Sequence, residues 1–362
     1  MRTLVVSTSY PRFSGDAGGH FVAAQVARFA ARGEAVEVVA PGCAPQFEDR
    51  GPVRIHWAGG VRGFGWPGVE SRFRTAPLPT LLGLAEGSVR ITQVLERLTA
   101  KASPSDLRIV AHWLVPSVSP WLLRVSPALP VAGYAHGADV RFLRRLPAFL
   151  RTRWLRRILA RARELHFASA SLRDALLDAV TDSALRREFE HRACVTLPEL
   201  AMPSARPGVA EREARRARIQ ARRGDLLVIA LGRLVPDKGY RWAVDAVATM
   251  RSAHLVVVGD GPSRPHLERR ARDLGARVTF LGQLDREEAL AWLAAADVLV
   301  HPSLVEAAPT VVREARELGI PVVAAEAGDV ASWAARDDGI RCVAADPRHI
   351  ARELERFARV PA

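Results

Sequence analysis

Short apolar runs alternate with amphipathic segments along most of the 362 residues. This alternation predicts parallel strands, each followed by a helix, because a parallel strand covered on both faces is apolar along its length. The segments between the runs have helical periodicity, as in residues 21–32 and 172–180. The expected strands are residues 4–7, 36–40, 108–111, 131–134 and 165–168, and then 226–231, 255–258, 278–281, 298–300, 322–324 and 341–343.

The alternation stops after Pro198 and resumes at Leu226. Between them, residues 203–223 are rich in proline, alanine and arginine, which predicts a linker with a short charged helix. We therefore expect an α/β chain of two Rossmann-like, doubly wound domains that face a central cleft. The predicted parts are an N-terminal domain at 1–200, a linker at 201–224, a C-terminal domain at 225–345, and a helix within 346–362 that could pack back on the N-terminal domain.

The composition narrows the class of protein. The net charge is +13 and the sequence pI is about 11.0, so nucleic acid, an anionic membrane surface and small anionic substrates would all be attracted. Cys43, Cys194 and Cys342 lie far apart without metal-type spacing, which predicts reduced core thiols in a cytoplasmic protein. No stretch reaches the roughly 20 apolar residues that span a bilayer. We expect no metal site and a soluble or peripheral chain.

A basic turn follows the predicted strand 226–231. Gly232 and Arg233 come directly after the strand, and Lys238 and Gly239 open the next predicted helix. Arginine can hold a diphosphate as a fork and lysine as a point charge. A turn with two glycines can also be purely structural. The specific spacing of the two cations favours a functional role.

Two glutamates follow the predicted strand 298–300. Glu306 lies in the loop and Glu314 about one and a half turns into a helix that Pro309 can begin. A carboxylate repels a diphosphate but accepts hydrogen bonds from hydroxyl groups. The backbone N–H groups of residues 308–311 would suit phosphate at a helix N-terminus. Each glutamate alone could be a surface charge, but with the basic turn they indicate a nucleotide-sugar site.

The N-terminal domain offers weaker signals. Gly18 and Gly19 form a glycine pair between the first strand and helix, where a ligand could approach the backbone, and Asp16 and His20 flank them. His136 ends a buried strand, a position that faces the ligand crevice in a doubly wound sheet. We expect Asp139 to orient that loop. His112 also ends a strand, and we interpret it as structural.

Residues 141–163 form a basic amphipathic segment. They run from Arg141 to Arg163 and hold nine arginines, no acid and interleaved apolar side chains. Such a segment can lie on an anionic membrane surface, or it can be a helix packed on the sheet with its arginines in solvent. Both interpretations stay open at this point.

Several stretches of the chain together resemble the retaining, group-1 (family 4) glycosyltransferases of the GT-B fold. The resemblance covers nearly the whole chain and is most specific in the C-terminal half. The matching stretches are Gly232-Arg233-Leu234 with Lys238-Gly239, Pro302-Ser303 with Glu306 and Glu314, Val258-Gly259-Asp260-Gly261-Pro262, Leu281-Gly282-Gln283-Leu284, Ala315 with Gly319-Ile320-Pro321-Val322-Val323, the Gly18-Gly19 pair, and His136-Gly137-Ala138-Asp139.

The resemblance implies a role for each matching residue. Arg233 and Lys238 would bind the donor diphosphate, Glu306 the donor sugar, and Glu314 the ribose hydroxyls. His136 would lie beside the reacting sugar and act with Glu306 in catalysis. The other donor-binding candidates are Gly19, Ala308, Pro309, Thr310 and Val311, with Asp16, Gly18, Asp139, Gly261 and Leu284 as further ones.

The implied activity is retaining glycosyl transfer of the hexosyltransferase type. A UDP-, GDP- or ADP-sugar would be the donor, with no metal or other cofactor. The acceptor would be a hydroxyl of a glycan, glycolipid or small molecule, in polysaccharide, lipopolysaccharide or glycolipid synthesis. The protein would be cytoplasmic and would bind no nucleic acid, and its basic segment could attach it to the inner face of the membrane. At Ala307, Glu199 and Glu326 the chain departs from the family's usual residues. The resemblance therefore leaves open the identity of the donor sugar and the form of the hinge between the two domains.

Three alternatives remain on the sequence alone. The first is a catalytically inactive basic scaffold that binds nucleic acid or a membrane surface. The second is a sugar-nucleotide epimerase on the same fold, which would need no acceptor. The third is a dinucleotide oxidoreductase, but the chain lacks the Gly-x-Gly-x-x-Gly fingerprint after a first strand.

Overall fold

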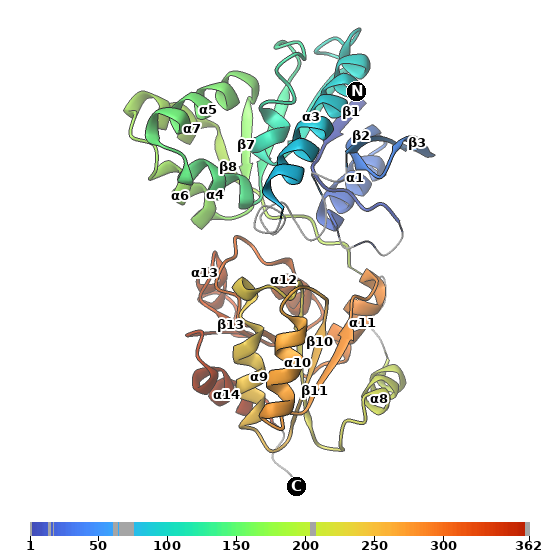
Figure 1. Cartoon of the computed structure of the whole chain (residues 1–362), viewed down its shortest axis with the longest axis vertical. Helices are drawn as coiled ribbons and strands as arrows, with labels where there is room; N and C mark the ends of the chain where they lie inside the picture. The colour runs from blue at the N-terminus through green and yellow to red at the C-terminus, as the bar shows by residue number, and fades with distance from the viewer. Residues whose placement is uncertain are drawn as a thin grey trace. The chain divides into compact units, whose positions relative to one another are not determined.

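The chain folds into two compact units, each built on one parallel sheet with helices packed against it. A computed structural model describes residues 2–13, 16, 18–60, 64, 76–202 and 208–358. The units are Met1–Ala201, coloured blue to green in Figure 1, and Met202–Ala362, coloured yellow to red. The prediction of an α/β chain with two Rossmann-like domains is confirmed.

The sheet of the first unit has the order β3-β4-β2-β1-β5-β6-β7-β8. Neighbouring strands are parallel except β3 and β4, which pair antiparallel at one edge. The order reverses between β1 and β5, so loops that follow these two strands open side by side. The strands are β1 Arg2–Val6, β2 Ala35–Gly42, β3 Pro45–Arg50, β4 Val53–Gly60, β5 Leu107–His112, β6 Val131–Ala135, β7 Glu164–Phe167 and β8 Ala193–Val195.

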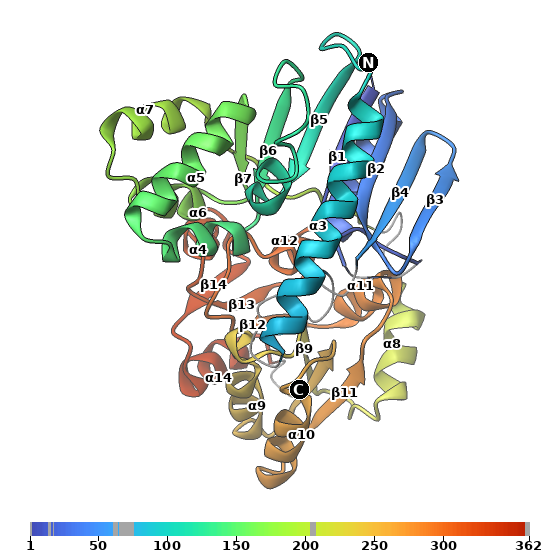
Figure 2. The same cartoon turned by 45° about the horizontal axis from the view of Figure 1, so that its top comes forward.

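Helices cover this sheet with their apolar faces. In α1, Val22, Val26 and Phe29 pack on strand residues that include Val38 and Ile55. Helix α3 packs against β2 and β4, and it runs in front of the sheet in Figure 2. The helical segments are α1 His20–Ala31, α3 Pro77–Thr99, the irregular turn η1 Leu114–Val118, α4 Ala138–Arg145, α5 Ala148–Arg161, α6 Ala170–Leu177 and α7 Ser183–Arg192.

The second unit has a six-stranded parallel sheet of order β11-β10-β9-β12-β13-β14. Each strand predicted for this part overlaps an observed one, and the prediction 226–231 coincides with β9. The apolar sequence Leu-Leu-Val-Ile-Ala-Leu suits a central strand that is buried on both faces. The strands are β9 Leu226–Leu231, β10 Ala253–Val258, β11 Val278–Gly282, β12 Val298–His301, β13 Val322–Ala325 and β14 Ile340–Val343.

Two apolar clusters bury the two faces of this second sheet. Leu227 and Ile229 point to one cluster and Val228 and Ala230 to the other, as strand alternation requires. Aspartates begin two of the surrounding helices, since Asp285 caps α11 and Asp346 caps α14. The helical segments are α8 Val209–Arg218, η2 Pro236–Lys238, α9 Tyr240–Ala248, α10 Arg264–Asp273, α11 Arg286–Ala295, α12 Thr310–Glu317, α13 Val330–Ala334 and α14 Pro347–Glu355.

The structure places both terminal segments of the second unit against that unit. Helix α8, in the predicted linker, packs on α11, and Arg216 pairs with Asp297 at 2.6 Å. Helix α14 packs on α9 through Ile350 and Leu354, which are buried in the second unit's core. The sequence left the docking of this last helix open. Both helices are therefore attached to the second sheet.

The sequence did not predict several elements of the first unit. Strand β3 is polar and mostly exposed at the sheet edge, so it lacks the apolar run by which the other strands are recognised. Strand β8 has only three residues, and two of them are exposed. The alternating strand β4 and the helix α3 were also not predicted.

Asp297 holds α8 to the sheet and gives a test of this architecture. Its carboxylate accepts from Leu227 N at 2.7 Å and from Arg216 Nη2 at 2.6 Å. Asp297→Ala removes both contacts, so we expect a loss of about 2–3 kcal/mol in the second unit's free energy of unfolding. Calorimetry of the full chain would show a fall of about 5 °C or more in the transition of the second unit.

Arg352→Ala is the control for this substitution. The Arg352 side chain is 71% exposed and lies 3.9 Å from Glu353, so its loss should shift the transition by no more than about 1 °C. Equal shifts in the two variants would contradict the structural role of Asp297.

Candidate functional site

The strand order of the second sheet reverses between β9 and β12. Strand β9 pairs with β10 on one side and with β12 on the other. In open α/β sheets, ligands bind outside the carboxyl ends of the strands at such a reversal. The loop after β9 contains Arg233 and Lys238, and the loop after β12 contains Glu306. Topology thus brings the basic turn and the first predicted glutamate to one edge of the sheet.

These two loops are bonded to each other. Leu304 N donates to the carbonyl oxygen of Asp237 at 2.8 Å, and Ser303 Oγ donates to the same oxygen at 3.3 Å. Gly239 has φ 64°, and a Cβ atom there would collide with the carbonyl oxygen of Pro302. Glycine is required at Gly239 for both reasons, and its absence of a side chain lets the two loops approach.

A charged cluster that is mostly buried lies between the two loops. Lys238 Nζ donates to Glu306 Oε1, and His301 Nε2 lies 2.9 Å from the same oxygen. Burial would raise the pKa of Glu306, but the Lys238 ammonium and the His301 ring outweigh it and hold that pKa well below its usual range. Glu306 is therefore ionised at neutral pH. The sequence did not single out His301, and only its place at the end of β12 could have indicated it.

Lysine at position 238 is unusual for this chain. Of the 52 basic residues, only Lys101 and Lys238 are lysines. An ammonium has three N–H donors on one compact charge, and the described contact with Glu306 uses one of them. Lys238 can therefore hold the Glu306 carboxylate and still donate to another anion. The N–H donors of an arginine lie in one plane, so an arginine could less easily donate to the Glu306 carboxylate and to a second anion at once.

The N-terminus of α12 lies next to this cluster in the chain. Helix α12 begins at Thr310, with Pro309 at the N-cap position and no side chain capping its N–H groups. The N–H of Asp329 donates to the carbonyl oxygen of Ala307 at 3.1 Å and so fixes the preceding loop. Ala308 and Val311 are buried. The arrangement presents backbone donors with the positive end of a helix dipole, which suits an anion.

Glu314 lies in the middle of α12 and is almost fully buried, with 2% of its surface exposed. Arg286, the first residue of α11, donates from Nη2 to Glu314 Oε1 at 2.9 Å. The ion pair fixes one carboxylate oxygen in place. The sequence did not single out Arg286, because a charge in the first turn of a helix is common on protein surfaces.

The remaining candidates of the second unit follow neighbouring strands at the same edge of the sheet. Arg233 is exposed just after β9. Gly261 follows β10, where its N–H donates to Asp260 Oδ1 at 2.7 Å. Leu284 lies between β11 and α11.

In the first unit, Gly18 and Gly19 lie at the reversal between β1 and β5. Gly19 has φ 72° and is the N-cap of α1, with no side chain capping the helix. Asp16 accepts from Gly18 N at 3.0 Å and from Arg12 Nε at 2.8 Å. Burial would raise the pKa of Asp16, but these donors lower it overall. Asp16 is thus directed at its own loop, which it holds in shape.

His136 follows β6 and forms a pair with His112. Nε2 of His136 lies 2.9 Å from Nδ1 of His112, and the two rings stack at 5.1 Å. Burial lowers the pKa of His136 to about 3 and that of His112 well below its usual range. Both rings are therefore neutral, and one nitrogen of the pair donates while the other accepts. Within the His136 ring, the contact with His112 uses Nε2 and leaves Nδ1 for a further partner.

Asp139 orients the His136 loop, as the sequence predicts. Its Oδ1 accepts from the backbone N–H groups of His136, Gly137 and Val140 at 3.0–3.2 Å. Its Oδ2 accepts from Leu114 N at 2.8 Å. Burial raises the pKa of this carboxyl, and the four donors act against that rise. Because the Asp139 carboxylate accepts from four backbone N–H groups, it is suited to positioning the loop.

The basic segment 141–163 forms α4 and α5. Leu143, Leu155 and Ile158 are buried in the first unit. Arg161 is also buried and donates to the carbonyl oxygen of Ser126 at 3.2 Å. Phe149, however, is 73% exposed. The exposed arginines of the two helices are Arg144, Arg145, Arg153, Arg156 and Arg157.

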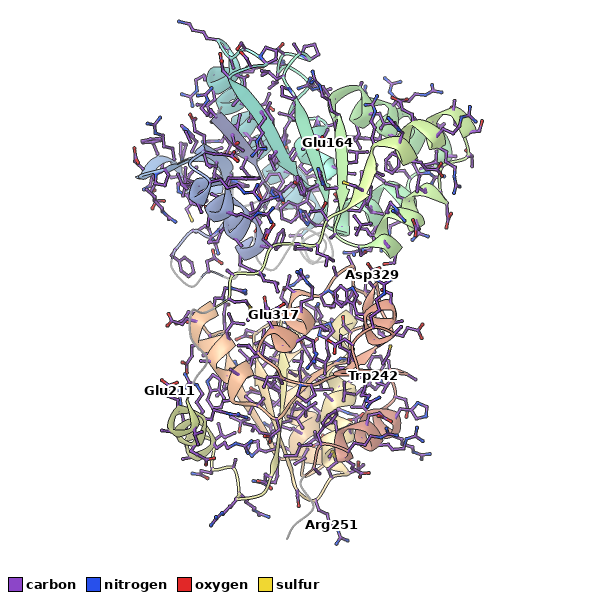
Figure 3. The ribbon with its side chains drawn as sticks, turned by 180° about the vertical axis from the view of Figure 1, so that it is seen from behind. Glu164, Glu211, Trp242, Arg251, Glu317 and Asp329 are labelled. Carbon is purple, nitrogen blue, oxygen red and sulfur yellow. The ribbon has the colours of Figure 1, made fainter. Side chains whose placement is uncertain are left out.

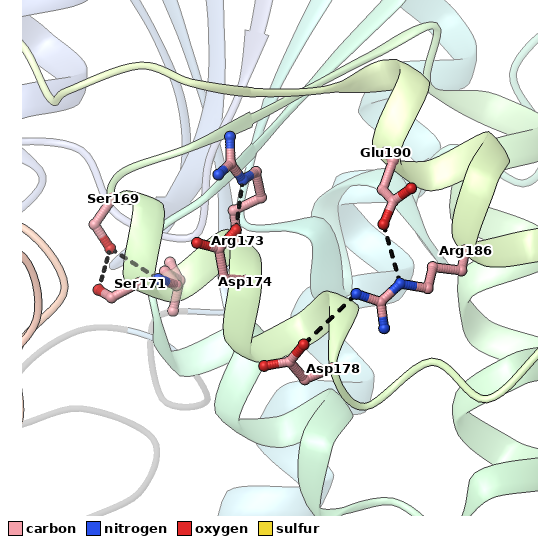
Figure 4. Close-up of polar contacts among 8 residues, drawn as sticks. Ser169, Ser171, Arg173, Asp174, Asp178, Arg186 and Glu190 are labelled. Carbon is pink, nitrogen blue, oxygen red and sulfur yellow. Dashed lines mark hydrogen bonds and ion pairs between the residues drawn. The ribbon is translucent and has the colours of Figure 1, made fainter.

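Helices α6 and α7 of the first unit carry several surface ion pairs. Figure 4 shows the polar contacts around a surface depression of α6 and α7, where Arg186 pairs with Asp178 at 3.6 Å and with Glu190 at 3.0 Å. Arg173 pairs with Asp174 at 2.8 Å. None of the predicted site residues lines this depression.

The prediction of core thiols is wrong. Cys43, Cys194 and Cys342 are free and exposed, because each lies at or near the end or edge of a strand rather than in a sheet interior. Within the described residues, no three side chains of His, Cys, Asp or Glu are grouped so that they could hold a metal ion. In the same part of the chain, no helix is both long enough and apolar enough to cross a bilayer.

The pH dependence of stability tests the Lys238–Glu306 pair. Lys238→Met leaves a buried carboxylate without its cation, so we expect a loss of about 3 kcal/mol at pH 7. The lowered pKa of Glu306 stabilises the fold above about pH 4.5, the usual carboxyl value, and this contribution falls as the pH drops below it. The difference between wild type and variant should therefore shrink below about pH 4.5 in denaturation experiments.

Lys101→Met is the matched control, since Lys101 is the chain's other lysine and is exposed. It should leave the stability curve unchanged at every pH. A Lys238→Met effect that stayed constant down to about pH 3 would show that the pair does not carry the stabilisation.

Comparison with known proteins adds to this geometry. Residues 225–359 match the family model described as glycosyl transferases group 1. The lipopolysaccharide core biosynthesis glycosyltransferase LpsE of Rhizobium meliloti is 34% identical over 135 residues, which cover 36% of this chain and 39% of that protein. The alpha-D-kanosaminyltransferase of Streptomyces kanamyceticus is 33% identical over 130 residues, 33% of this chain and 34% of that one. The chain thus matches less than half the length of these relatives.

Solved structures share the fold over nearly the whole chain. Sucrose-phosphate synthase from Thermosynechococcus elongatus superposes with a TM-score of 0.71 at 21% identity, covering 99% of this chain and 92% of that one. Anabaena Alr3699/HepE in complex with UDP gives a TM-score of 0.63 at 18% identity, covering 98% and 89%. The expected GT-B fold is confirmed by these likenesses.

Proposed function

We propose, on the premise that residues 225–359 belong to the group 1 glycosyl transferases, that the whole chain transfers a sugar from a nucleotide-diphosphate sugar to an acceptor hydroxyl. The observation that carries the proposal is the cluster of Lys238, Glu306 and His301 at the reversal of the second sheet. This cluster joins a cation to an ionised carboxylate, and the uncapped N-terminus of α12 follows Glu306 closely in the chain. A diphosphate and a sugar need those groups together.

Lys238 joins the two halves of the proposed donor site. Two of its N–H donors would go to the diphosphate while the third keeps the Glu306 carboxylate in place. Arg233 and the N-terminus of α12 would add the remaining positive potential. Glu306 would accept from a hydroxyl of the donor sugar. Its lowered pKa keeps it an acceptor throughout the neutral range.

Glu314 would bind the ribose hydroxyls in this proposal. Arg286 binds one of its carboxylate oxygens at 2.9 Å and so holds the carboxylate of Glu314 in one orientation. Gly261 and Leu284 follow the neighbouring strands β10 and β11 at the same edge. We assign them backbone contacts to the nucleotide.

The reaction would proceed through a transition state with oxocarbenium character, with negative charge growing on the leaving diphosphate. Lys238, Arg233 and the α12 N-terminus would stabilise that charge without reorganising, which is a large term in enzymes of this kind. We propose retention of the anomeric configuration from the resemblance to the retaining family. The departing phosphate would accept the proton of the acceptor hydroxyl.

His136 would act on the reacting sugar from the first unit. Its Nε2 is bound to His112, so Nδ1 is the atom that would contact substrate. Because its pKa is about 3, the ring would hydrogen-bond as a neutral group and would not bring a positive charge to the oxocarbenium. Asp139 would hold the loop, and the Gly18–Gly19 turn would let the sugar approach the backbone.

The proposed donors are UDP-, GDP- or ADP-sugars, and no metal or other cofactor is part of the proposal. The UDP complex of HepE and the lipopolysaccharide role in the name of LpsE favour a nucleotide sugar and a cell-surface glycan or glycolipid acceptor. Such an acceptor is consistent with a cytoplasmic protein at the inner face of the membrane.

Kinetics of site variants test the proposal. Glu306→Ala should lower kcat at least about 100-fold, because the sugar loses its acceptor, while the Kd of the nucleoside diphosphate stays equal or falls as Lys238 loses its competing anion. Arg233→Ala should instead raise that Kd about tenfold or more, equal to about 1.4 kcal/mol. Titration calorimetry and product formation measure the two effects separately.

Arg251→Ala is the control for Arg233→Ala. Arg251, labelled in Figure 3, lies between α9 and β10, at the amino end of β10 and so at the sheet edge opposite the site. It should leave Kd and kcat unchanged. Wild-type rates in both Glu306→Ala and Arg233→Ala would refute the site.

The exposed basic face of α4 and α5 favours association with an anionic membrane surface, as a part of this proposal. Phe149 would enter the headgroup region while the neighbouring arginines attract anionic lipids.

Phe149→Ser should reduce co-sedimentation with phosphatidylglycerol vesicles several-fold at low salt. Phe47→Ser is the control, since Phe47 is 55% exposed on strand β3, where the nearby Arg50 and Arg54 are paired with Glu48 and Asp49. Equal loss in both, or no wild-type binding, would contradict it.

A further inference from the structure

One row of side chains crosses the first sheet from His112 to Cys194. His112 is the Cα partner of Tyr134, Tyr134 of His166, and His166 of Cys194, on the successive strands β5, β6, β7 and β8. Partners in register on parallel strands point to the same face of a sheet. The row therefore ends with a thiol at the sheet edge, beside an imidazole.

Tyr134 holds the His166 ring in a fixed orientation. The two rings stack at 4.4 Å with an interplanar angle of 9°. Tyr134 in turn stacks on His112 at 5.1 Å. His166 is only 16% exposed at its side chain, so this packing leaves the ring little freedom.

Cys194, His166 and Glu164 are arranged as a nucleophile, a base and an orienting acid. Cys194 Sγ lies 3.1 Å from His166 Nδ1, and Glu164 Oε2 lies 3.3 Å from His166 Nε2. An ionised carboxylate can only accept, so Nε2 carries the hydrogen and the lone pair of Nδ1 faces the thiol. Figure 3 labels Glu164, which begins β7. A base oriented by a third group is the arrangement that activates nucleophiles.

Burial lowers the pKa of His166, and the contact with Glu164 acts against this. The ring is therefore neutral at neutral pH, as a base that accepts a proton must be. Thr196 Oγ1 also lies 2.8 Å from Nδ1 and competes with the thiol for the same lone pair. The Thr196 hydroxyl thus moderates the activation of Cys194.

The other two thiols have different surroundings. Burial and Glu326 raise the pKa of Cys342, which disfavours its thiolate. Neither Cys342 nor Cys43 has a histidine within hydrogen-bond distance in the described part of the chain. All three cysteines are exposed, so access does not distinguish them.

We propose that Cys194 is a covalent modification site that forms a mixed disulfide with small disulfides by thiol–disulfide exchange. His166 takes the thiol proton as Cys194 Sγ attacks one sulfur of the disulfide. The new bond joins Cys194 to that sulfur, the old sulfur–sulfur bond breaks, and the leaving thiolate receives the proton from His166. One disulfide and one thiol give one disulfide and one thiol, so no other oxidant is needed. This proposal does not depend on the transferase activity.

Mass spectrometry of peptides tests it, with glutathione disulfide as the probe and the full-length protein at pH 7. In the wild type, Cys194 should form its mixed disulfide at least about tenfold faster than Cys43 and Cys342, the scale expected of a positioned base. Cys43 and Cys342 are internal controls for access in every sample. A Cys194 rate equal to theirs would overturn the proposal.

Variants separate activation from mere exposure. Glu164→Gln and His166→Asn should each slow Cys194 severalfold and leave the Cys43 rate unchanged. Thr196→Val should speed Cys194, because the thiol then has the Nδ1 lone pair to itself. Glu164 is 69% exposed at its side chain, so Glu164→Gln keeps the test valid if His166→Asn fails to fold. An unchanged Cys194 rate in both Glu164→Gln and Thr196→Val would refute the role of His166.

Discussion

The ion pair between Lys238 and Glu306 is the interaction on which the second unit's site depends. It lies where the strand order reverses. Removal of either charge would leave the other one buried and unpaired, which costs free energy of folding. The pair also ties the loop after β9 to the loop after β12, beside the contacts that Asp237 makes with Ser303 and Leu304. A ligand with a diphosphate and a hydroxyl group could bind Lys238 through the first and Glu306 through the second while the ion pair stays intact.

The first unit also has hydrogen-bonded side chains near the reversal of its sheet, but there they are neutral rings. Its sheet also reverses, between β1 and β5, and the paired rings of His112 and His136 lie at the end of β5 and just beyond β6. The Asp139 carboxylate accepts hydrogen bonds from four backbone N–H groups and so fixes the loop that contains His136. The reversal of the second sheet thus has an ion pair beside it, and the reversal of the first sheet has a pair of neutral rings nearby.

Most of the fold could be predicted from the sequence because parallel strands buried on both faces leave continuous apolar runs, as in β9. Strand β3 and the three-residue β8 could not, since an exposed edge or a very short strand has no such run. The sequence placed Arg233, Lys238, Glu306 and Glu314 on strand-end loops and a helix. It did not indicate that Lys238 bonds Glu306, or that Arg286 bonds Glu314. Such pairings depend on strand order and loop approach, which local patterns do not contain.

Titration calorimetry of UDP, GDP and ADP against the wild type and Lys238→Met tests the central claim most directly. The account predicts that one nucleoside diphosphate binds the wild type with a stoichiometry of one, and that Lys238→Met weakens it by about tenfold or more, or about 1.4 kcal/mol. Binding of equal strength to a folded Lys238→Met variant would contradict the account, as would a folded wild type that binds none of the three.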